Sequence, residues 1–216
     1  MQLAREPGRV YVVDDDAEIC RSISLVCRSV GYSTKTYTTA EAYLAAGIDE
    51  EPHCLIVDLL LPGMTGMKLC REILAANSAC GFIVITGNGD VPSAVEAMRL
   101  GAADYLEKPF GRQRLLDSVH EVLQIVQRQY SQQQRQAEAL SRLARLTARE
   151  KEVFRKVAAG QPTKAIAASC GISTRTVDVH RSRILQKLGI ESSMQLADFI
   201  TALDRCPGGR ASWLNR

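Results

Sequence analysis

Two hydrophobic periodicities alternate along residues 1–125, and this alternation restricts the possible fold more than any other feature of the chain. Short runs rich in β-branched and aromatic residues recur at strand length. They lie at Val10–Val13, Ser33–Tyr37, Cys54–Asp58, Phe82–Thr86 and Asp104–Glu107. Apolar residues at helical spacing separate these runs. The pattern predicts an α/β fold with a doubly wound, five-stranded parallel sheet and helices on both faces.

The remainder of the chain has a different composition. Residues 126–143 are rich in Gln and Arg and contain neither Gly nor Pro. We interpret them as a solvated helical linker, with a glutamine-rich disordered linker as the alternative. Thr147 and Glu150 then have the spacing of a capping box at a helix start. Helices are predicted near 148–159, 162–169, 174–188 and 193–203. We therefore expect a small all-α domain over 144–205, followed by a flexible tail over 206–216.

Charge divides the chain in the same way. Residues 1–125 hold 11 Lys and Arg against 17 Asp and Glu, a net of −6, whereas residues 126–216 hold 16 against 7, a net of +9. A basic C-terminal part suits a polyanion such as nucleic acid. A solvated basic surface would give the same count, so charge alone leaves both interpretations open.

Composition also bears on location. No apolar run approaches the roughly 18 residues that a membrane helix needs. The N-terminal segment lacks the apolar stretch of a signal peptide. The seven cysteines form no CxxC pair, which favours reduced thiols over disulfides or zinc ligands. We expect a cytoplasmic protein without a membrane partner.

Polar side chains gather where the predicted strands end. Asp14 and Asp15 follow the first strand, and Asp58 ends the third. Thr86 ends the fourth strand, and Lys108 follows the fifth. Parallel strands present such ends at one edge of the sheet, where ligands bind. Clustered carboxylates call for a cation, and Mg²⁺ prefers oxygen ligands. An aspartate is also a nucleophile toward phosphorus. Helix capping, a strand end or a surface charge is the simpler role for each residue alone.

The motifs VVDDD, VDLLLPGMTG, VITGNGD and YLEKPF follow one another at residues 9–125. This part resembles the receiver domain of two-component response regulators, and ITGNGDVPSAVEAMRLGAADYLEKPF is especially similar to the FixJ-like subfamily. The resemblance implies the strand order 2-1-3-4-5. It also implies that Asp58 accepts a phosphoryl group from a sensor histidine kinase. Asp14, Asp15, Asp58 and the backbone carbonyl of Leu60 would hold Mg²⁺.

The same resemblance implies a switch. Thr86 and Lys108 would contact the phosphoryl group, and Tyr105 would turn inward with Thr86, although core packing is the simpler role for this tyrosine. The changed surface would let two receivers form a homodimer. Leu60 and Asn88 would flank the path of hydrolytic water and tune dephosphorylation. The Lys108–Pro109 bond would be cis.

The segment QPTKAIAASCGISTRTVDVHRSRILQKLG is typical of a helix-turn-helix motif, whose second helix enters the DNA major groove. On a helical wheel of 174–188, Val177, Ile184 and Leu188 lie on the core side. The opposite side and its edges carry the candidate DNA contacts. These candidates, together with flanking residues, are Lys164, Thr174, Arg175, Thr176, Asp178, Val179, Arg181, Ser182, Arg183 and Lys187.

LTAREKEV, KAIAASCGIS and TVDVHRSRILQKLG make residues 144–203 resemble the LuxR-type helix-turn-helix. The acidic residue in TVDVH departs from the lysine of some NarL-type relatives, which puts a direct transfer of their base contacts in doubt. The two resemblances together imply a transcription regulator, not an enzyme, that binds double-stranded promoter DNA.

We expect phosphorylation to promote dimerisation and promoter binding, with RNA polymerase as a further partner and activation as the outcome. Two other functions stay open. One is a Mg²⁺-dependent phosphatase with an aspartate nucleophile, although Leu60 stands where such enzymes place a second acid. The other is a receiver joined to a helical module that binds RNA or protein.

Overall fold

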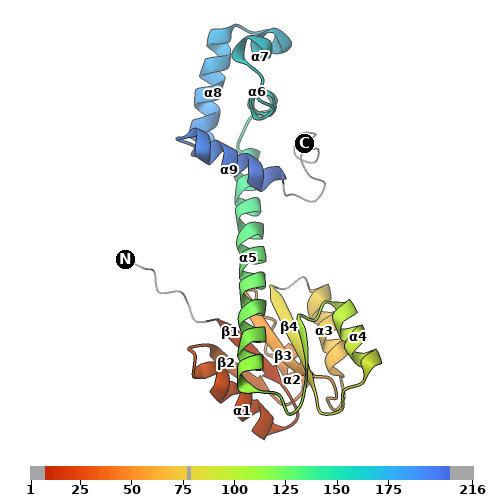
Figure 1. The fold of residues 1–216 in the computed structure, drawn as a ribbon. Helices are drawn as coiled ribbons and strands as arrows, with labels where there is room; N and C mark the ends of the chain where they lie inside the picture. Colours follow the sequence, from red (N-terminus) through yellow and green to blue (C-terminus); the bar gives the residue numbers. More distant parts are fainter. Residues whose placement is uncertain (1–7, 77–78, 205–216) are drawn as a thin grey trace. The chain divides into compact units, whose positions relative to one another are not determined.

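The computed structural model describes residues 8–76 and 79–204, and it divides into two compact units between Tyr130 and Ser131. Figure 1 shows the sheet of the first unit and the helices of the second. Each unit is described by itself. No helix among the described residues combines the length and the apolar character needed to cross a membrane.

The first unit contains a five-stranded parallel sheet in the order β2-β1-β3-β4-β5, which confirms the predicted order. The strands are β1 Arg9–Val13, β2 Ser33–Tyr37, β3 His53–Asp58, β4 Cys80–Thr86 and β5 Asp104–Glu107. All six residues of β3 are buried, as expected for a central strand covered on both faces. The sheet therefore brings the C-terminal ends of four neighbouring strands to one edge.

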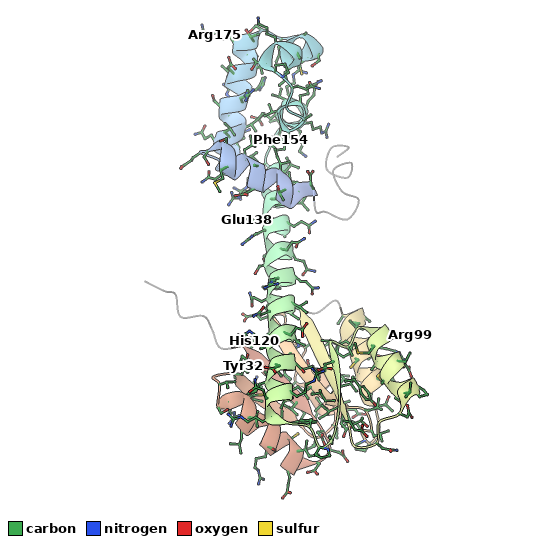
Figure 2. All side chains as sticks on the ribbon, viewed as in Figure 1. Tyr32, Arg99, His120, Glu138, Phe154 and Arg175 are labelled. Atoms are coloured by element: carbon green, nitrogen blue, oxygen red, sulfur yellow. The ribbon has the colours of Figure 1, made fainter. Side chains whose placement is uncertain are left out.

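Helices cover both faces of this sheet. They are α1 Ala17–Arg28, α2 Ala40–Ala45, α3 Gly66–Ala75, α4 Val91–Leu100 and α5 Arg112–Ala144. One hydrophobic cluster packs α2, α3 and α4 on the first face, and a second packs α1 and α5 on the other. The glutamine-rich residues 126–143 lie within α5. On that second face, Tyr32 and His120 meet in a hydrogen bond of 3.2 Å (Figure 2).

The apolar stripe of α4 is helical but does not face the core. Val91, Val95 and Met98 are 76%, 42% and 50% exposed. The small residue Ala97 is the one that α4 buries against the sheet. Helical spacing predicted the helix correctly, but it did not indicate which side the helix packs on, because the larger apolar residues lie on the solvent side.

The second unit contains the helices α6 Ala148–Ala158, α7 Thr163–Cys170, α8 Thr174–Leu188 and α9 Ser193–Asp204. Its core includes Val153, Phe154 and Ile166 (Figure 2 labels Phe154). The capping box of Thr147 and Glu150 is present at the start of α6. These residues hold the helix start by satisfying amide groups that lack a partner within the helix.

The cysteines agree with the expectation of free thiols in the described part of the chain. Six of them are free, and four of these are buried. The seventh, Cys206, lies outside the described residues, as does the predicted tail over 206–216. Cys20 and Cys27, which are seven residues apart, share the buried face of α1.

Candidate functional site

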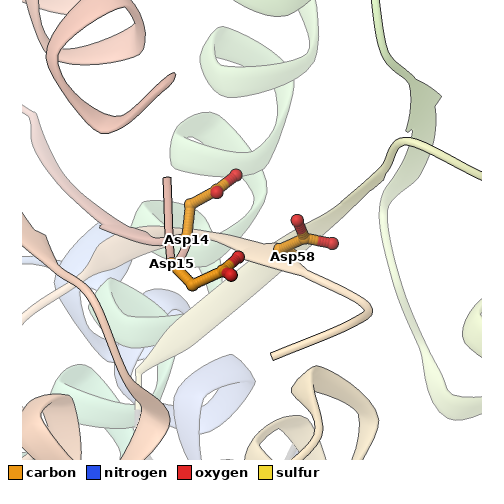
Figure 3. Close-up of side chains that lie close together, drawn as sticks. All are labelled: Asp14, Asp15 and Asp58. Carbon is orange, nitrogen blue, oxygen red and sulfur yellow. The ribbon is translucent and has the colours of Figure 1, made fainter. Parts of the chain in front are cut away.

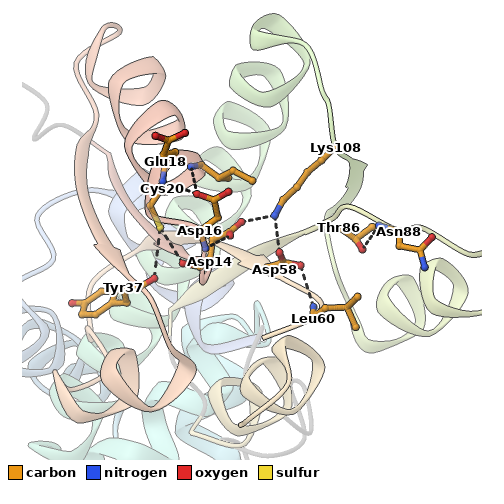
Figure 4. Close-up of polar contacts among 11 residues, drawn as sticks. Asp14, Asp16, Glu18, Cys20, Tyr37, Asp58, Leu60, Thr86, Asn88 and Lys108 are labelled. Carbon is orange, nitrogen blue, oxygen red and sulfur yellow. Dashed lines mark hydrogen bonds and ion pairs between the residues drawn. The ribbon is translucent and has the colours of Figure 1, made fainter. Parts of the chain in front are cut away.

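The predicted polar residues meet at the C-terminal edge of the sheet. Asp58 and Thr86 are the last residues of β3 and β4. Asp14 follows β1, and Lys108 follows β5. Figure 3 shows the carboxylates of Asp14, Asp15 and Asp58 close together, and Figure 4 shows the contacts around them. Residues from four strands thus converge on one small volume, although 94 positions separate Asp14 from Lys108.

Lys108 forms the centre of this cluster. Its Nζ donates to Oδ2 of Asp14 and to Oδ2 of Asp58, each at 2.6 Å (Figure 4). The other oxygens of these carboxylates accept from backbone amides. Asp14 Oδ1 accepts from Asp16 at 2.9 Å, and Asp58 Oδ1 accepts from Leu60 at 3.1 Å. Both carboxylates are therefore held in fixed orientations.

The electrostatics of the cluster are unbalanced, because one ammonium serves two buried carboxylates. Burial raises the pKa of Asp14, even though its hydrogen bond from Lys108 acts in the opposite direction. Burial also disfavours the charged form of Lys108, but its hydrogen bonds to Asp14 and Asp58 outweigh this effect and raise its pKa. Lys108 thus stays charged, and the surrounding carboxylates still attract a second cation.

The carboxylates of Asp14, Asp15 and Asp58 fit a divalent metal. They offer oxygen atoms that all lie within 4.8 Å of one another, and Asp15 alone of the three is exposed. Oxygen donors with an open, solvated side suit Mg²⁺, which keeps several water ligands. The third residue of the DDD run, Asp16, has a different role. Its Oδ1 accepts from Glu18 and Ile19 and caps α1, as one member of this run was expected to do.

Thr86 and Tyr105 lie beside one another behind this cluster. Thr86 is fully buried, and its hydroxyl accepts from the amide of Asn88 at 3.2 Å. The Tyr105 hydroxyl is enclosed without a hydrogen bond of normal geometry. Burial raises the pKa of this phenol, whereas the Thr86 hydroxyl lowers it. An enclosed hydroxyl without a proper partner costs free energy. The Lys108–Pro109 bond is cis, as the resemblance implied.

The loop between β3 and α3 packs tightly against the backbone of Asp58. A side chain at Gly66 would place its Cβ 2.0 Å from the backbone oxygen of Asp58. The amide of Gly66 donates to the carbonyl of Leu59 at 3.2 Å, which closes the loop. The side chain of Leu60 is 60% exposed.

One residue that contacts this loop was not predicted from the sequence. The carboxylate of Glu41 accepts a hydrogen bond from the amide of Met64 at 2.9 Å. This is a tertiary contact that no sequence motif indicates.

The second unit presents a polar helix face. Val177, Ile184 and Leu188 are the buried residues of α8, as the helical wheel predicted. Most of the candidate DNA contacts are exposed. These are Lys164, Thr174, Arg175, Asp178, Val179, Ser182, Arg183 and Lys187. Thr176 is half-buried and its hydroxyl bonds to that of Ser173 at 2.8 Å.

Two of the basic residues that were predicted to contact DNA form hydrogen bonds within the second unit. The guanidinium of Arg181 donates to the hydroxyl of Thr163 at 3.4 Å. Lys187 donates to the buried carboxylate of Glu150 at 2.7 Å. The remaining charged side chains, among them Arg175 and Arg183, are exposed on α8, the second helix of the motif, which in helix-turn-helix proteins enters the DNA major groove.

Comparisons with known proteins agree with both units. The family described as response regulator receiver domain matches residues 10–120, and the family described as bacterial regulatory proteins, luxR family, matches residues 144–200. The transcriptional regulatory protein FixJ of Azorhizobium caulinodans is 38% identical over 187 residues, which cover 87% of this chain and 89% of that protein.

Two solved structures extend this similarity. The response regulator StyR has a TM-score of 0.80 and 33% identity, and the match covers 92% of this chain and 99% of that one. The beryllofluoride-activated receiver dimer of NtrC4 has a TM-score of 0.52 and 31% identity, with 55% of this chain and 98% of that one covered. The chain therefore belongs to the FixJ-type response regulators, which are transcription regulators of two-component systems with a receiver domain and a LuxR-type DNA-binding domain.

Proposed function

We propose that Asp58 is the residue that accepts the phosphoryl group, and that a sensor histidine kinase is its donor. The observation that carries this proposal is the convergence of Asp14, Asp58 and Lys108 at one sheet edge, with both carboxylates oriented by hydrogen bonds. Phosphoryl transfer depends mainly on positioning and charge neutralisation, and this arrangement offers both.

The transfer requires no general base, because the Asp58 carboxylate already carries the attacking electron pair. An oxygen of Asp58 forms the new O–P bond as the N–P bond of the phosphohistidine breaks, and the electron pair of that bond returns to the imidazole nitrogen. Asp14, Asp15, Asp58 and the Leu60 carbonyl would hold Mg²⁺, which neutralises charge on the phosphoryl oxygens. Lys108 and Thr86 would hold the transferred group.

The response would pass through Thr86 and Tyr105 to the surface of α4. This surface already exposes Val91, Val95 and Met98, a concentration of apolar groups that suits an interface. We propose that phosphorylated receivers form a homodimer there. The NtrC4 receiver, solved as an activated dimer, supports this proposal by analogy. Leu60 and Asn88, beside the acceptor and Thr86, would set the lifetime of the phosphoryl group.

Dimerisation would pair two helix-turn-helix units on adjacent half-sites of promoter DNA. Pairing raises the effective concentration of the second unit, so moderate receiver association gives a large gain in occupancy. Arg175 and Arg183 are the exposed cations of α8 that we assign to base or phosphate contacts. Recruitment of RNA polymerase and activation of transcription would follow.

Incubation with acetyl phosphate and Mg²⁺ tests the acceptor. We expect a hydroxylamine-labile adduct on the wild type by mass spectrometry, and none on Asp58→Asn. Asp16→Asn is the matched control, because Asp16 is close in sequence to the metal cluster but caps α1. An adduct of equal amount on Asp58→Asn would contradict the proposal.

Sedimentation and a DNA shift assay test the later steps. We expect the phosphorylated chain to sediment as a dimer and to shift duplex DNA more strongly, with affinity falling as salt rises. Arg175→Ala combined with Arg183→Ala should abolish the shift but leave the adduct on Asp58. An unchanged sedimentation coefficient after phosphorylation would refute the dimer switch.

A further inference from the structure

We propose that Glu41 is a positioning residue for the phosphoryl-acceptor site: its carboxylate holds the β3–α3 loop so that the Leu60 carbonyl is in place for the metal. This inference rests on the proposed function of Asp58 and its Mg²⁺. Glu41 lies in the first turn of α2, outside the sheet edge that carries the acidic cluster. It touches the loop 23 positions further along the chain.

The base of the loop is anchored from the sheet and from Asp58. Leu59 donates its amide to the carbonyl of Ile85 at 2.9 Å, and Leu60 donates to Asp58 Oδ1 at 3.1 Å. Gly66 closes the base through Leu59 and packs on the Asp58 backbone. These contacts fix the two ends of the segment, and the side chain of Leu61, which is buried in the core, anchors it between them. None of these contacts is a hydrogen bond to the turn at 62–64.

The turn at 62–64 depends on Glu41. Within the described chain, the hydrogen bond from Met64 to Glu41 Oε1, at 2.9 Å, is the one that holds the backbone of residues 61–64. Gly63 has φ +78, and a Cβ there would lie 2.9 Å from Glu41 Oε1. The carboxylate therefore packs against the turn as well as bonding to it. The left-handed backbone favours glycine at position 63, and a larger residue there would push the Glu41 carboxylate aside.

Glu41 has no ion-pair partner among the described residues. Its role is thus that of an acceptor for the loop and not of a charge that balances a lysine or arginine. Outer contacts that orient a metal ligand have large effects on metal binding. Loosening of residues 63 and 64 would reach the carbonyl of Leu60 across two intervening residues, 61 and 62.

Mg²⁺ binding measured by calorimetry on the full chain tests the proposal. Glu41→Ala removes the acceptor, and we expect the Mg²⁺ dissociation constant to rise about 5-fold, the effect of one ordinary hydrogen bond. Glu41→Gln keeps an acceptor oxygen without the charge and should bind Mg²⁺ within about 2-fold of the wild type. Glu18→Ala, which removes an exposed carboxylate from the first turn of α1, controls for charge near the site.

A second readout separates positioning from loss of folding. At saturating Mg²⁺, Glu41→Ala should reach the wild-type rate of phosphorylation by acetyl phosphate, with only the half-saturating Mg²⁺ concentration shifted. Equal Mg²⁺ affinity of Glu41→Ala and wild type would overturn the proposal, as would Glu41→Gln behaving like Glu41→Ala. A lower plateau at saturating Mg²⁺ would overturn it too.

The proposed metal site is tested separately by Asp15→Asn. If Asp15→Asn binds Mg²⁺ as tightly as the wild type, the metal site itself is wrong and the assignment of Glu41 falls with it. If Asp15→Asn loses Mg²⁺ but Glu41→Ala does not, the assignment of Glu41 alone fails.

Discussion

Both units of the molecule contain a buried carboxylate that pairs with a lysine, and the two pairs differ in balance. In the sheet unit, Lys108 is shared between Asp14 and Asp58, with Asp15 close by. In the helical unit, Lys187 serves Glu150 alone, and the same carboxylate also accepts from the amide of Thr147. The first cluster has too few cations, whereas the second has one lysine for one acid.

The pKa values of Asp14 and Glu150 shift in opposite directions, in agreement with this difference. Burial raises the pKa of Asp14 above its usual value. The hydrogen bond from Lys187 lowers the pKa of Glu150 to about 2. A carboxylate whose charge is balanced by its own lysine stabilises the fold and has little remaining affinity for a ligand cation. A crowded carboxylate keeps an affinity for a further cation, which is the property that a phosphoryl-acceptor site needs.

Removal of the shared ammonium gives the largest effect that this comparison predicts. In Lys108→Met, we expect phosphorylation by acetyl phosphate to slow about 100-fold, because a preorganised cation is lost from the transferring group. Mg²⁺ should bind more tightly, since the ammonium no longer competes for Asp14 and Asp58. Lys68→Met, an exposed cation of α3, is the control. Stopped-flow kinetics measures the phosphorylation rate, and calorimetry measures the Mg²⁺ affinity. An unchanged phosphorylation rate would show that Lys108 does not assist the transfer.

Truncation of the satisfied carboxylate should act on stability and not on chemistry. Glu150→Ala loses the capping box and leaves Lys187 unpaired, which we expect to destabilise the helical unit by about 2 kcal/mol. Hydrogen exchange of the α6 amides at increasing urea concentrations measures this loss of stability. Glu152→Ala, which breaks the partly exposed pair with Arg149, should change stability much less, because solvent screens an exposed ion pair. Equal effects of the two substitutions would contradict the assigned role of Glu150.

Acid should weaken the two units in different pH windows. His53 is fully buried, donates from Nδ1 to the Glu51 carbonyl and accepts from Tyr43 at Nε2. Burial lowers its pKa below 6.5, so the unfolded chain binds more protons and the sheet unit loses stability as the pH falls below 6.5. Glu150, with its pKa lowered from 4.5 to about 2, keeps its contribution above pH 4.5 and loses it between 4.5 and about 2.

Urea midpoints of each unit as a function of pH measure these windows. His53→Gln should remove the decline of the sheet unit just below pH 6.5, while the helical unit should show no change in that range. A helical unit that weakens together with the sheet unit below pH 6.5 would show that the two windows are not separate.

The smallest predicted effect concerns two lysines, both of which were predicted from the sequence to contact DNA. Lys164 is exposed, whereas Lys187 is bound to Glu150. Lys164→Ala should lower the salt dependence of DNA affinity by about one unit of logarithmic slope, the contribution of one phosphate contact. Lys187→Ala should leave that slope almost unchanged and reduce stability instead. Titrations at several salt concentrations distinguish the two, and equal slopes would restore Lys187 as a phosphate contact.

The sheet and the polar edge could be predicted because both follow from short-range patterns. Each strand is an apolar run, and the residues that end or follow it, such as Asp58 and Lys108, must lie at the same edge once the strands are parallel. The capping box of Thr147 and Glu150 is likewise a matter of spacing along the chain.

Contacts between segments that are distant in the sequence could not be predicted from such short-range patterns. A helical wheel describes one helix, so it could not show that Lys187 meets Glu150, which comes from another helix. The link from Glu41 to Met64 depends on the packing of a six-residue helix, α2, against a loop. The exposure of Val91 in α4 also depends on which neighbours that helix meets.

Because Gly66 has no side chain, the first turn of α3 lies directly against the backbone of Asp58. Even one methyl group at this position would push against the peptide that carries residue 58. A substitution at an exposed position of α3 such as Lys68 leaves this close packing intact, whereas any side chain at the first residue of the helix would disturb it.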